Sequence, residues 1–401
     1  MLIAVNTRLL IKNRIDGTGW FINETLKRIT RDHPEHDFVF LFDRQFSKDF
    51  IFSDNITTRV IRPQTRHPFL WYWWFEISLT LVLKKLKPDL FISPDGFLPL
   101  YIKTPCIPVI HDLNFYHRPN DLPRMIRNYY NRFFPKFAEK ATRIITVSEY
   151  SRKDIAESYG VNPEIIDVVY NGANEIFKPA SEIEKNETKK RFTSGKDYFV
   201  YAGSLHPRKN IFSLLQAFED FKKETGSDMK LMLAGETLFT TPGLKKKLKH
   251  MDYRNDVILT GKVSYEDMRL IISSATAMTF VSHYEGFGIP VLESMLCGVP
   301  VIASDITSIP EVAGDAVLYI NPSKPETITF AMKEINTDAK LRENLIEKGF
   351  VQSKKFSWDK TAKAFWESVE KVLNCCTKVH KEDIKGHKEK EKNRIINNIN
   401  G

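Results

Sequence analysis

The sequence predicts an α/β protein with two doubly wound domains. Its 401 residues exceed what one hydrophobic core usually serves, and a hydrophobic fraction of 42% is enough for two cores. Short β-branched or aromatic runs alternate with longer helical stretches, which is typical of βαβ units and parallel sheets. The alternation breaks at residues 175–196, a polar segment rich in Lys and Glu, and then resumes.

The expected strands form one group on each side of this break. The first group comprises residues 2–6, 38–42, 58–61, 89–92, 107–111, 144–147 and 165–169. The second comprises residues 199–202, 230–234, 257–259, 277–281, 299–303 and 317–320. Helical patterns follow at 325–336, 340–355 and 358–374. We therefore expect an amino-terminal domain at 1–178, a linker at 175–196, a carboxy-terminal domain at 197–357 and a polar, disordered tail at 375–401.

Charge and composition narrow the classes of partner. The formal charge of +9 admits nucleic acid, an anionic bilayer or a phosphorylated substrate. Residues 378–394 hold seven Lys or Arg against four Asp or Glu, so the folded body carries only a modest excess that does not indicate nucleic acid. The four cysteines suit neither a disulfide framework nor zinc. We expect a cytoplasmic protein, soluble or peripheral on the inner face of the cell membrane.

An aromatic run at residues 69–75 leaves two interpretations open. Aromatic residues at helical spacing usually belong to a core, which is the interpretation we favour. The alternative is contact with an anionic membrane, assisted by Lys84, Lys85 and Lys87 or by the basic tail. The longest apolar stretch, 69–83, is interrupted by Glu76 and is shorter than the roughly 20 residues that a membrane span needs.

The strongest constellation is Glu285-Gly-Phe-Gly-Ile-Pro-Val-Leu-Glu293, directly after the expected strand 277–281. Pro290 suits the first turn of a helix, since its missing N–H has no partner to lose there. We therefore expect a helix to begin directly after the two glycines, with free N–H groups at its amino terminus that can bind a diphosphate. Carboxylates accept paired hydrogen bonds from vicinal hydroxyls, so Glu285 and Glu293 suit sugar or ribose.

Other candidate residues follow strands in both halves. Gly203 has no side chain and so lets a ligand approach the backbone closely. Arg208 and Lys209 are cations at the start of an expected helix, where the helix dipole disfavours positive charge. We therefore expect an anionic ligand beside them. Three further pairs stand at strand ends: Gly17 with Gly19, His111 with Asp112, and Gly261 with Lys262. A glycine pair after a strand is usually a turn, and a His-Asp pair at a strand end is more often structural.

The segment 285–293 resembles the signature of the group 1 (family 4) retaining GT-B glycosyltransferases. The motifs Gly-Val-Pro-Val-Ile-Ala-Ser at 298–304 and Ile-Pro-Glu-Val-Ala-Gly at 309–314 continue the similarity, which covers the chain to about residue 373. The resemblance implies the GT-B fold, two Rossmann-like domains facing across a cleft, with the helix 358–374 crossing back to the first domain. It also implies domain closure, with hinges in 175–196 and before Trp358.

The resemblance assigns roles to the candidate residues. Glu285 would hold the donor sugar, Glu293 the ribose, and His111 would face the sugar, with Asp112 as its orienter or a helix cap. Gly17 and Gly19 would form the loop against acceptor and phosphate. Ser204 stands where the family often has arginine, so we assign Arg208 beside Lys209 as the substitute cation. The main-chain amides of Gly288 to Leu292 would meet the sugar and diphosphate, and the backbone at Gly261 and Lys262 would meet the base. The expected donor-binding residues are Gly203, Lys262, Gly286, Phe287, Gly288, Ile289, Val291, Leu292 and Glu293.

The resulting expectation is a retaining hexosyltransferase that uses a nucleotide diphosphate sugar and a glycan or lipid-linked acceptor. The chain has no Asp-x-Asp, so we expect no metal and no cofactor. The departing phosphate would take the acceptor proton. The stretch 203–210 resembles bacterial mannosyl and related transferases of surface-polysaccharide assembly, which favours GDP-mannose. The alternatives are a sugar-nucleotide epimerase of the same fold and a non-catalytic nucleotide-sugar-binding scaffold.

Overall fold

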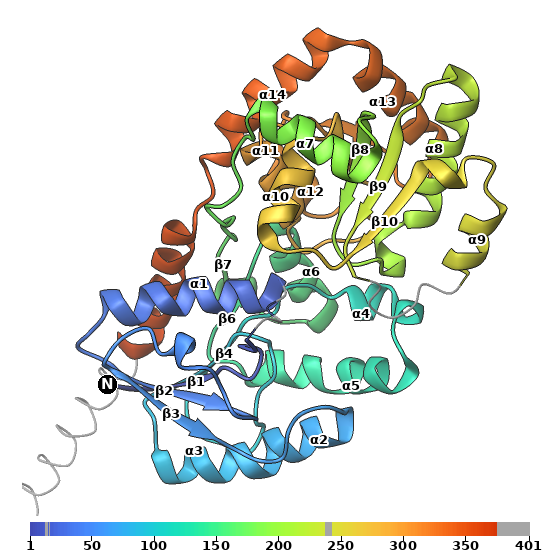
Figure 1. The fold of residues 1–401 in the computed structure, drawn as a ribbon. Coiled ribbons are helices and arrows are strands. Elements are labelled where there is room, and N and C mark those ends of the chain that lie inside the picture. Colours follow the sequence, from blue (N-terminus) through green and yellow to red (C-terminus); the bar gives the residue numbers. More distant parts are fainter. Residues whose placement is uncertain (13–14, 16, 237–242, 375–401) are drawn as a thin grey trace, which may run out of the picture.

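The computed structural model describes residues 1–12, 15, 17–236 and 243–374. Two α/β domains face each other, the amino-terminal one at the bottom of Figure 1 and the carboxy-terminal one at the top. The expected disordered tail, 375–401, lies outside the described residues. The expectation of two doubly wound, Rossmann-like domains is confirmed.

The amino-terminal domain is built on a parallel sheet in the order β3-β2-β1-β4-β5. A parallel pair, β6-β7, continues it through a bridge between Val109 and Ile145. Since the strand order reverses beside β1, the carboxyl ends of β1 and β4 open a crevice for a ligand. The strands are β1 (Leu2–Asn6), β2 (Asp37–Phe42), β3 (Ile56–Val60), β4 (Leu90–Ser93), β5 (Cys106–Pro108), β6 (Ile144–Thr146) and β7 (Ile166–Val168).

Helices cover both faces of this sheet. One face packs on α1 (Gly17–Asp32) and on the helical residues 358–374, and the other packs on the remaining long helices. Those are α2 (Pro68–Trp73), the π-helical η2 (Trp74–Leu79), α3 (Thr80–Leu86), α5 (Arg124–Lys140) and α6 (Glu149–Tyr159), while α4 (Asn114–His117), η1 (Lys48–Phe50), η3 (Pro119–Asp121) and η4 (Pro163–Ile165) are short.

The carboxy-terminal domain has a six-stranded parallel sheet in the order β10-β9-β8-β11-β12-β13. Its strands are β8 (Tyr198–Ala202), β9 (Lys230–Ala234), β10 (Val257–Gly261), β11 (Ala277–Phe280), β12 (Val301–Ser304) and β13 (Leu318–Ile320). Its helices are α7 (Glu182–Thr193), η5 (Pro207–Lys209), α8 (Ile211–Thr225), α9 (Leu244–His250), η6 (Arg254–Asp256), α10 (Tyr265–Ser273), α11 (Ile289–Leu296), α12 (Ile309–Ala313), α13 (Pro325–Thr337) and α14 (Ala339–Ser353).

The expected linker 175–196 is in large part a helix. Ser181 caps α7 and Glu184 reaches back to the cap backbone, which forms a capping box. Glu184 also pairs with Arg269 of α10 at 2.6 Å, so α7 belongs to the carboxy-terminal domain. The description of this segment as a linker was therefore wrong for residues 182–193.

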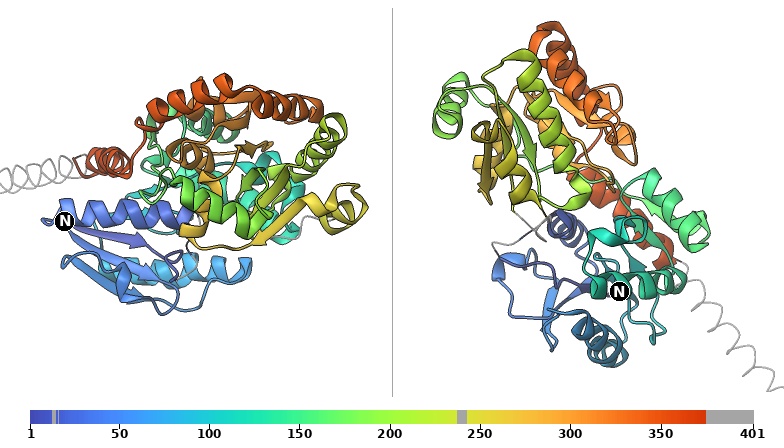
Figure 2. Two further views of the ribbon diagram at one scale, coloured as in Figure 1. Left: turned by 45° about the horizontal axis from the view of Figure 1, so that its top comes forward. Right: turned by 90° about the vertical axis from the view of Figure 1, so that its right-hand side faces the viewer.

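The chain crosses between the domains twice, and the two crossings touch. Residues 358–374 pack on the amino-terminal core, with Trp358, Phe365 and Trp366 buried there. Thr361 donates to the carbonyl of Tyr170 at 2.7 Å. A Cβ on Gly172 would lie 2.4 Å from the nitrogen of Trp358, so glycine is required where the crossings meet. Figure 2 shows the final helix beside the amino-terminal domain.

The aromatic run 69–75 divides between core and surface. Trp74 and Phe75 are fully buried, and the Trp74 indole donates to the carbonyl of Ile61 at 2.9 Å. Phe69 and Trp73 are 66% and 46% exposed. The core interpretation therefore holds for Trp74 and Phe75 but not for the exposed Phe69 and Trp73. No helix among the described residues is long and apolar enough to span a bilayer.

Candidate active site between the two domains

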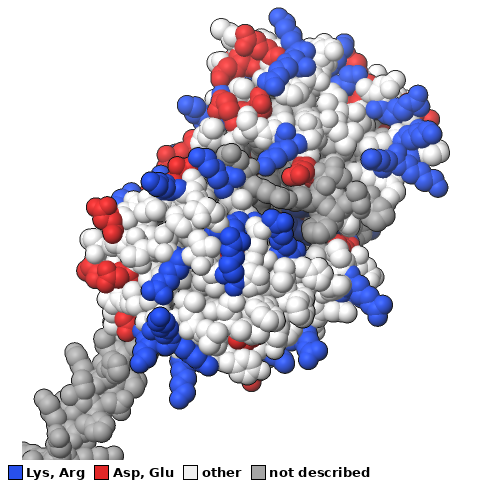
Figure 3. All heavy atoms as spheres, turned by 60° about the horizontal axis from the view of Figure 1, so that its bottom comes forward, with Lys and Arg blue, Asp and Glu red and all other residues white. Residues whose placement is uncertain are grey.

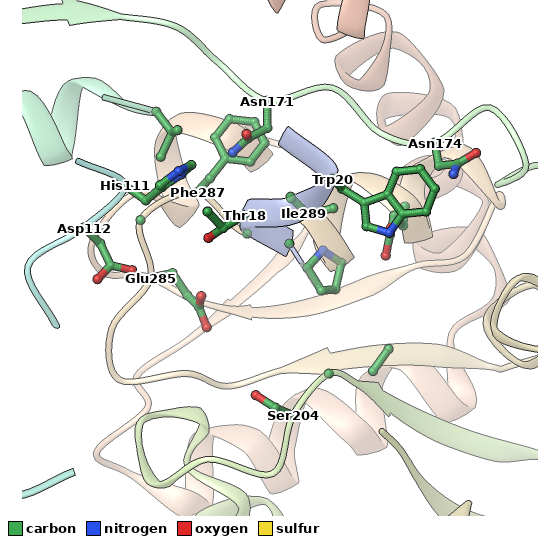
Figure 4. Close-up of a pocket in the computed structure, with 18 of the residues that line it drawn as sticks. Thr18, Trp20, His111, Asp112, Asn171, Asn174, Ser204, Glu285, Phe287 and Ile289 are labelled. Carbon is green, nitrogen blue, oxygen red and sulfur yellow. The ribbon is translucent and has the colours of Figure 1, made fainter. Parts of the chain in front are cut away.

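A cavity of about 360 Å³ lies between the domains and takes its walls from both. Figure 4 shows Thr18, His111 and Asn171 from the amino-terminal domain facing Ser204, Glu285 and Ile289 from the carboxy-terminal one. The complete lining is Gly17, Thr18, Trp20, His111, Asp112, Val147, Asn171, Asn174, Phe177, Ala202, Gly203, Ser204, Arg208, Lys209, Tyr265, Met268, Glu285, Gly286, Phe287, Gly288, Ile289, Pro290, Glu293 and Trp358.

Glu285 lies at the centre of an ion triad in this cavity. Lys209 Nζ is 2.5 Å from Glu285 Oε1, and Arg208 Nη1 is 2.8 Å from Glu285 Oε2. Burial opposes ionisation of Glu285, but the two cations outweigh it and hold its pKa at about 2. Burial, with the charge of Arg208, lowers the pKa of Lys209 to about 8. With all three groups ionised, the triad carries one net positive charge.

The loop that supplies the two cations differs from the expectation in its geometry. Arg208 and Lys209 lie in the 3₁₀ turn η5, and α8 begins only at Ile211. Asn210, with φ of 59°, separates the two. The cations therefore do not sit in a helical first turn, so the dipole argument does not apply to them. Their anionic partner within the chain is Glu285.

Helix α11 points its amino terminus into the cavity. Gly288 caps it with φ of 105°, a left-handed conformation that favours glycine, and Ile289 and Pro290 begin its first turn. Glu293 follows one turn later and faces the cavity. Desolvation raises the pKa of Glu293 to about 8, and its carboxylate has no hydrogen bond with any residue that the structure describes.

Two of the expected donor-binding residues, named for their main-chain amides, turn their side chains away from the cavity. Val291 and Leu292 are fully buried in apolar clusters, because they occupy the face of α11 that packs against the domain core. Their side chains therefore do not reach the cavity, and the expected contact of their main-chain amides with the donor stays a prediction. Lys262 is exposed and is not among the residues that line the cavity, whereas Tyr265 and Met268, just beyond it, are.

His111 and Asp112 line the cavity from the end of the strand region around β5. The predicted strand reached residue 111, but β5 ends at Pro108, beyond which a bridge between Val109 and Ile145 continues the pairing. His111 Nε2 lies 3.0 Å from the carbonyl of Pro94. Asp112 Oδ1 accepts from the Asn114 N–H at 3.0 Å, so Asp112 caps the turn that begins α4.

The glycine pair at 17 and 19 lies in the first turn of helix α1. Gly17 lines the cavity and has no atom within 4 Å of an added Cβ, while Gly19 is buried. The structure thus brings together most of the residues singled out in the sequence: Gly17, His111, Gly203, Arg208, Lys209, Glu285, Gly286, Phe287, Gly288, Ile289 and Glu293.

Several cavity residues carry no sequence signal. Asn171 is 4% exposed, and its Oδ1 has no hydrogen-bond partner in the described part of the chain. Trp20 and Tyr265 meet edge to face from opposite domains, with ring centroids 4.9 Å apart. Trp358 enters the cavity from the final helix. These residues lie far apart along the chain, so only the fold reveals that they share one site.

Comparison with known proteins agrees with this geometry. The family model for glycosyl transferases group 1 matches residues 182–352, and that for glycosyltransferase family 4 matches residues 15–175. The chain is 29% identical to O-antigen chain mannosyltransferase B of Escherichia coli over 69% of its own length and 73% of the relative's. It is 28% identical to O-antigen chain mannosyltransferase RfbU of Salmonella typhimurium over 70% and 74% of the two lengths.

A solved structure shares the whole architecture. Anabaena Alr3699/HepE in complex with UDP-glucose superimposes with a TM-score of 0.70, covering 92% of this chain and all of that one at 16% identity. The fold and the interdomain cavity define a GT-B protein. The two matching family models then place it more narrowly: the chain belongs to the group 1, family 4-like glycosyltransferases.

Proposed function

We propose that this chain transfers a hexose, with retention of anomeric configuration, from a nucleotide diphosphate sugar to a glycan or lipid-linked acceptor in cell-surface polysaccharide assembly. The observation that carries the proposal is the triad of Glu285, Arg208 and Lys209, set beside the amino terminus of α11 in the interdomain cavity. A carboxylate for sugar hydroxyls and an excess positive charge for phosphate stand side by side there.

We propose the following orientation for the donor in the cavity. Its diphosphate meets Arg208, Lys209 and the free N–H groups at the start of α11, since a helix amino terminus favours anions. Glu293 accepts from the ribose hydroxyls, which supplies the hydrogen bonds that its carboxylate lacks. The Glu285 carboxylate accepts hydrogen bonds from the hexose hydroxyls, while Arg208 and Lys209 hold that carboxylate in place. His111 faces the sugar from the opposite wall.

In the transfer step, the acceptor oxygen forms a bond to the anomeric carbon as the bond from that carbon to the diphosphate oxygen breaks. The proton of the acceptor hydroxyl passes to the departing phosphate on the same face, so no side chain serves as general base. Arg208, Lys209 and the α11 amides stabilise the charge that develops on the leaving group. We propose that the reaction needs no metal ion; activity lost in chelator and restored by Mg²⁺ or Mn²⁺ contradicts this.

The sugar donor we favour is GDP-mannose, because two relatives are named as mannosyltransferases. A thermal-shift screen against GDP, UDP, ADP and their sugars tests the donor site. A ligand at 100 times its Kd stabilises by about 2.7 kcal/mol. We expect a shift with guanine nucleotides that is lost in Glu293→Ala; no shift with any nucleotide contradicts the proposal.

A lipid-linked acceptor requires access to a bilayer, and one face of the amino-terminal domain suits that role. Phe69, Trp73, Ile77 and Leu81 are exposed at helical spacing along α2, η2 and α3. Residues 66–87 and 124–140 together hold nine Lys or Arg against two Glu, of which Glu76 is buried. In Figure 3 basic side chains are scattered over this domain, with few acidic ones among them. Such a surface binds anionic headgroups.

Vesicle co-sedimentation tests this membrane contact. We expect binding to vesicles containing phosphatidylglycerol, little binding to pure phosphatidylcholine, and loss of binding in the double variant Phe69→Ser/Trp73→Ser. Trp74→Ala is unsuitable because that side chain is part of the core. Binding that is equal for the double variant and the parent protein contradicts the assignment. The location we propose is the cytoplasm, on the inner face of the membrane.

A further inference from the structure

The two neighbours of Glu285 in the chain, Tyr284 and Gly286, both form hydrogen bonds with the amino-terminal domain. On one side, the Tyr284 hydroxyl donates to Asp154 Oδ2 at 2.5 Å and accepts from the Leu113 N–H at 3.3 Å. On the other, the carbonyl of Gly286 accepts from the Ser148 hydroxyl at 2.8 Å. All of these contacts cross the interface between the domains.

Tyr284 is inserted into the amino-terminal domain as an anchor. It is 4% exposed, although it belongs to the carboxy-terminal domain. Its ring stacks on His117 with centroids 5.6 Å apart and meets Tyr150 edge to face at 6.0 Å. Its carbonyl accepts from Arg208 Nη1 at 2.9 Å, and the same nitrogen bonds to Glu285. The anchor is thus connected to the ion triad through Arg208.

A second contact reaches the same helix from a different loop. Glu311 of α12 accepts from the Glu149 N–H at 2.7 Å and from the Tyr150 N–H at 3.1 Å. These N–H groups belong to the first turn of α6, where a carboxylate is stabilised by the helix dipole. Ser148, the residue that caps α6 within its own domain, binds the Ser151 N–H instead. Glu311 therefore completes the α6 amino terminus from across the interface.

We propose that Tyr284, Asp154 and Glu311 are positioning residues that dock the carboxy-terminal domain on α6 and thereby hold Glu285 opposite His111 for transfer. None of the three lines the cavity. They act through the orientation of the two domains and not by touching the donor, so their loss should lower kcat and leave nucleotide affinity nearly unchanged. The proposal rests on the transferase function proposed above.

The expected size follows from the contacts removed. A buried hydrogen bond to a charged group is worth enough to change a rate or equilibrium by about tenfold or more. Tyr284→Phe removes the bond to Asp154 together with the one from the Leu113 N–H, and Asp154→Asn weakens the first of these because it replaces a charged acceptor by a neutral amide. Because the two variants share the bond between Tyr284 and Asp154, their combined effect should be smaller than the sum of the two. Glu311→Gln weakens an independent contact to the same helix and should act in the same direction.

The test compares these variants with Tyr198→Phe, which loses a buried tyrosine hydroxyl bonded to the Ile271 carbonyl wholly within the carboxy-terminal domain. We expect kcat to fall about tenfold or more in Tyr284→Phe and Asp154→Asn, with a nucleotide Kd close to that of the parent. Tyr198→Phe should keep the parent kcat. A parent-like kcat in both Tyr284→Phe and Glu311→Gln, or an equal loss in Tyr198→Phe, overturns the proposal.

Small-angle scattering separates this inference from the proposed function. If the parent protein transfers no sugar, the transferase proposal fails. The radius of gyration still tests whether Tyr284 and Glu311 hold the carboxy-terminal domain against α6. We expect a larger radius for Tyr284→Phe and Glu311→Gln than for the parent and Tyr198→Phe, at matched melting temperature. Identical radii for all four proteins contradict docking on α6.

Discussion

Replacing Gly286 by alanine should separate the two domains by a distance that the structure fixes. An added Cβ would lie 2.5 Å from the carbonyl oxygen of His111 and 2.9 Å from Asp112 Cβ. Gly286 does not have a left-handed φ, so alanine causes no backbone strain there. A relaxed carbon to oxygen contact is about 3.3 Å. The domains must therefore move apart by roughly 0.8 Å at this point, taking that contact distance.

This displacement should act on the rate. A misplacement of about 1 Å at a reacting centre can cost about 100-fold, and Gly286 lies between Glu285 and His111, on opposite walls of the cavity. We expect kcat for hexose transfer to fall about 10- to 100-fold. The melting temperature should change little because the clash is between domains. Steady-state kinetics and calorimetric nucleotide binding measure the two effects.

Gly349→Ala is the matched control, because the three atoms nearest to its Cβ would all belong to Met295 of the same domain, the closest of them 3.2 Å away. The control should keep the parent kcat. Transfer by Gly286→Ala at the parent rate would refute the claim that the close approach of the two walls is needed for the reaction.

Three further predictions concern the cavity. The pKa of Glu293 is about 8 in the free protein, and ribose hydroxyls favour its ionised form. Nucleotide affinity should therefore rise with pH up to about pH 8, and binding below that pH should release a proton. Calorimetry in two buffers measures the proton release, and Glu293→Gln should abolish the pH dependence. Lys209→Ala should lower kcat by about 100-fold or more with a smaller effect on Kd, because it removes a leaving-group cation; an unchanged kcat contradicts that role. Asn171→Ala should lower kcat/KM about tenfold without lowering Tm, since its Oδ1 loses no internal bond; a lower Tm with parent kinetics would indicate a structural role.

The sequence was sufficient where a local pattern dictates a local structure. Pro290 beside two glycines predicts the start of α11, and the structure places that helix terminus against the cavity. The strand rhythm predicts both sheets, because parallel strands buried on both faces read as short apolar runs. Strand ends were less accurate, as at β5, which ends at Pro108 although the prediction reached residue 111.

Residues that meet only through the tertiary fold were not predicted. Asn171, Trp20 and Trp358 share one cavity because separate crossings and helices converge there, which no local pattern records. The side chains of Val291 and Leu292 face the core because consecutive helical residues cannot all face one ligand, so only their main-chain amides stay candidates for donor contact. The helix α7 was missed although Ser181 and Glu184 have capping-box spacing, since its polar composition resembles a linker.

The most direct test of the central claim is transfer of radiolabelled hexose from GDP-mannose, UDP-glucose and UDP-N-acetylglucosamine to membranes of the source organism, with and without EDTA. We predict that label from one donor enters a glycan or lipid fraction in both conditions. The incorporation should be lost in Glu285→Gln, and the new linkage should keep the anomeric configuration of the donor. An epimerised nucleotide sugar without transfer, or binding of nucleotide sugar with no product from any donor, would contradict the account.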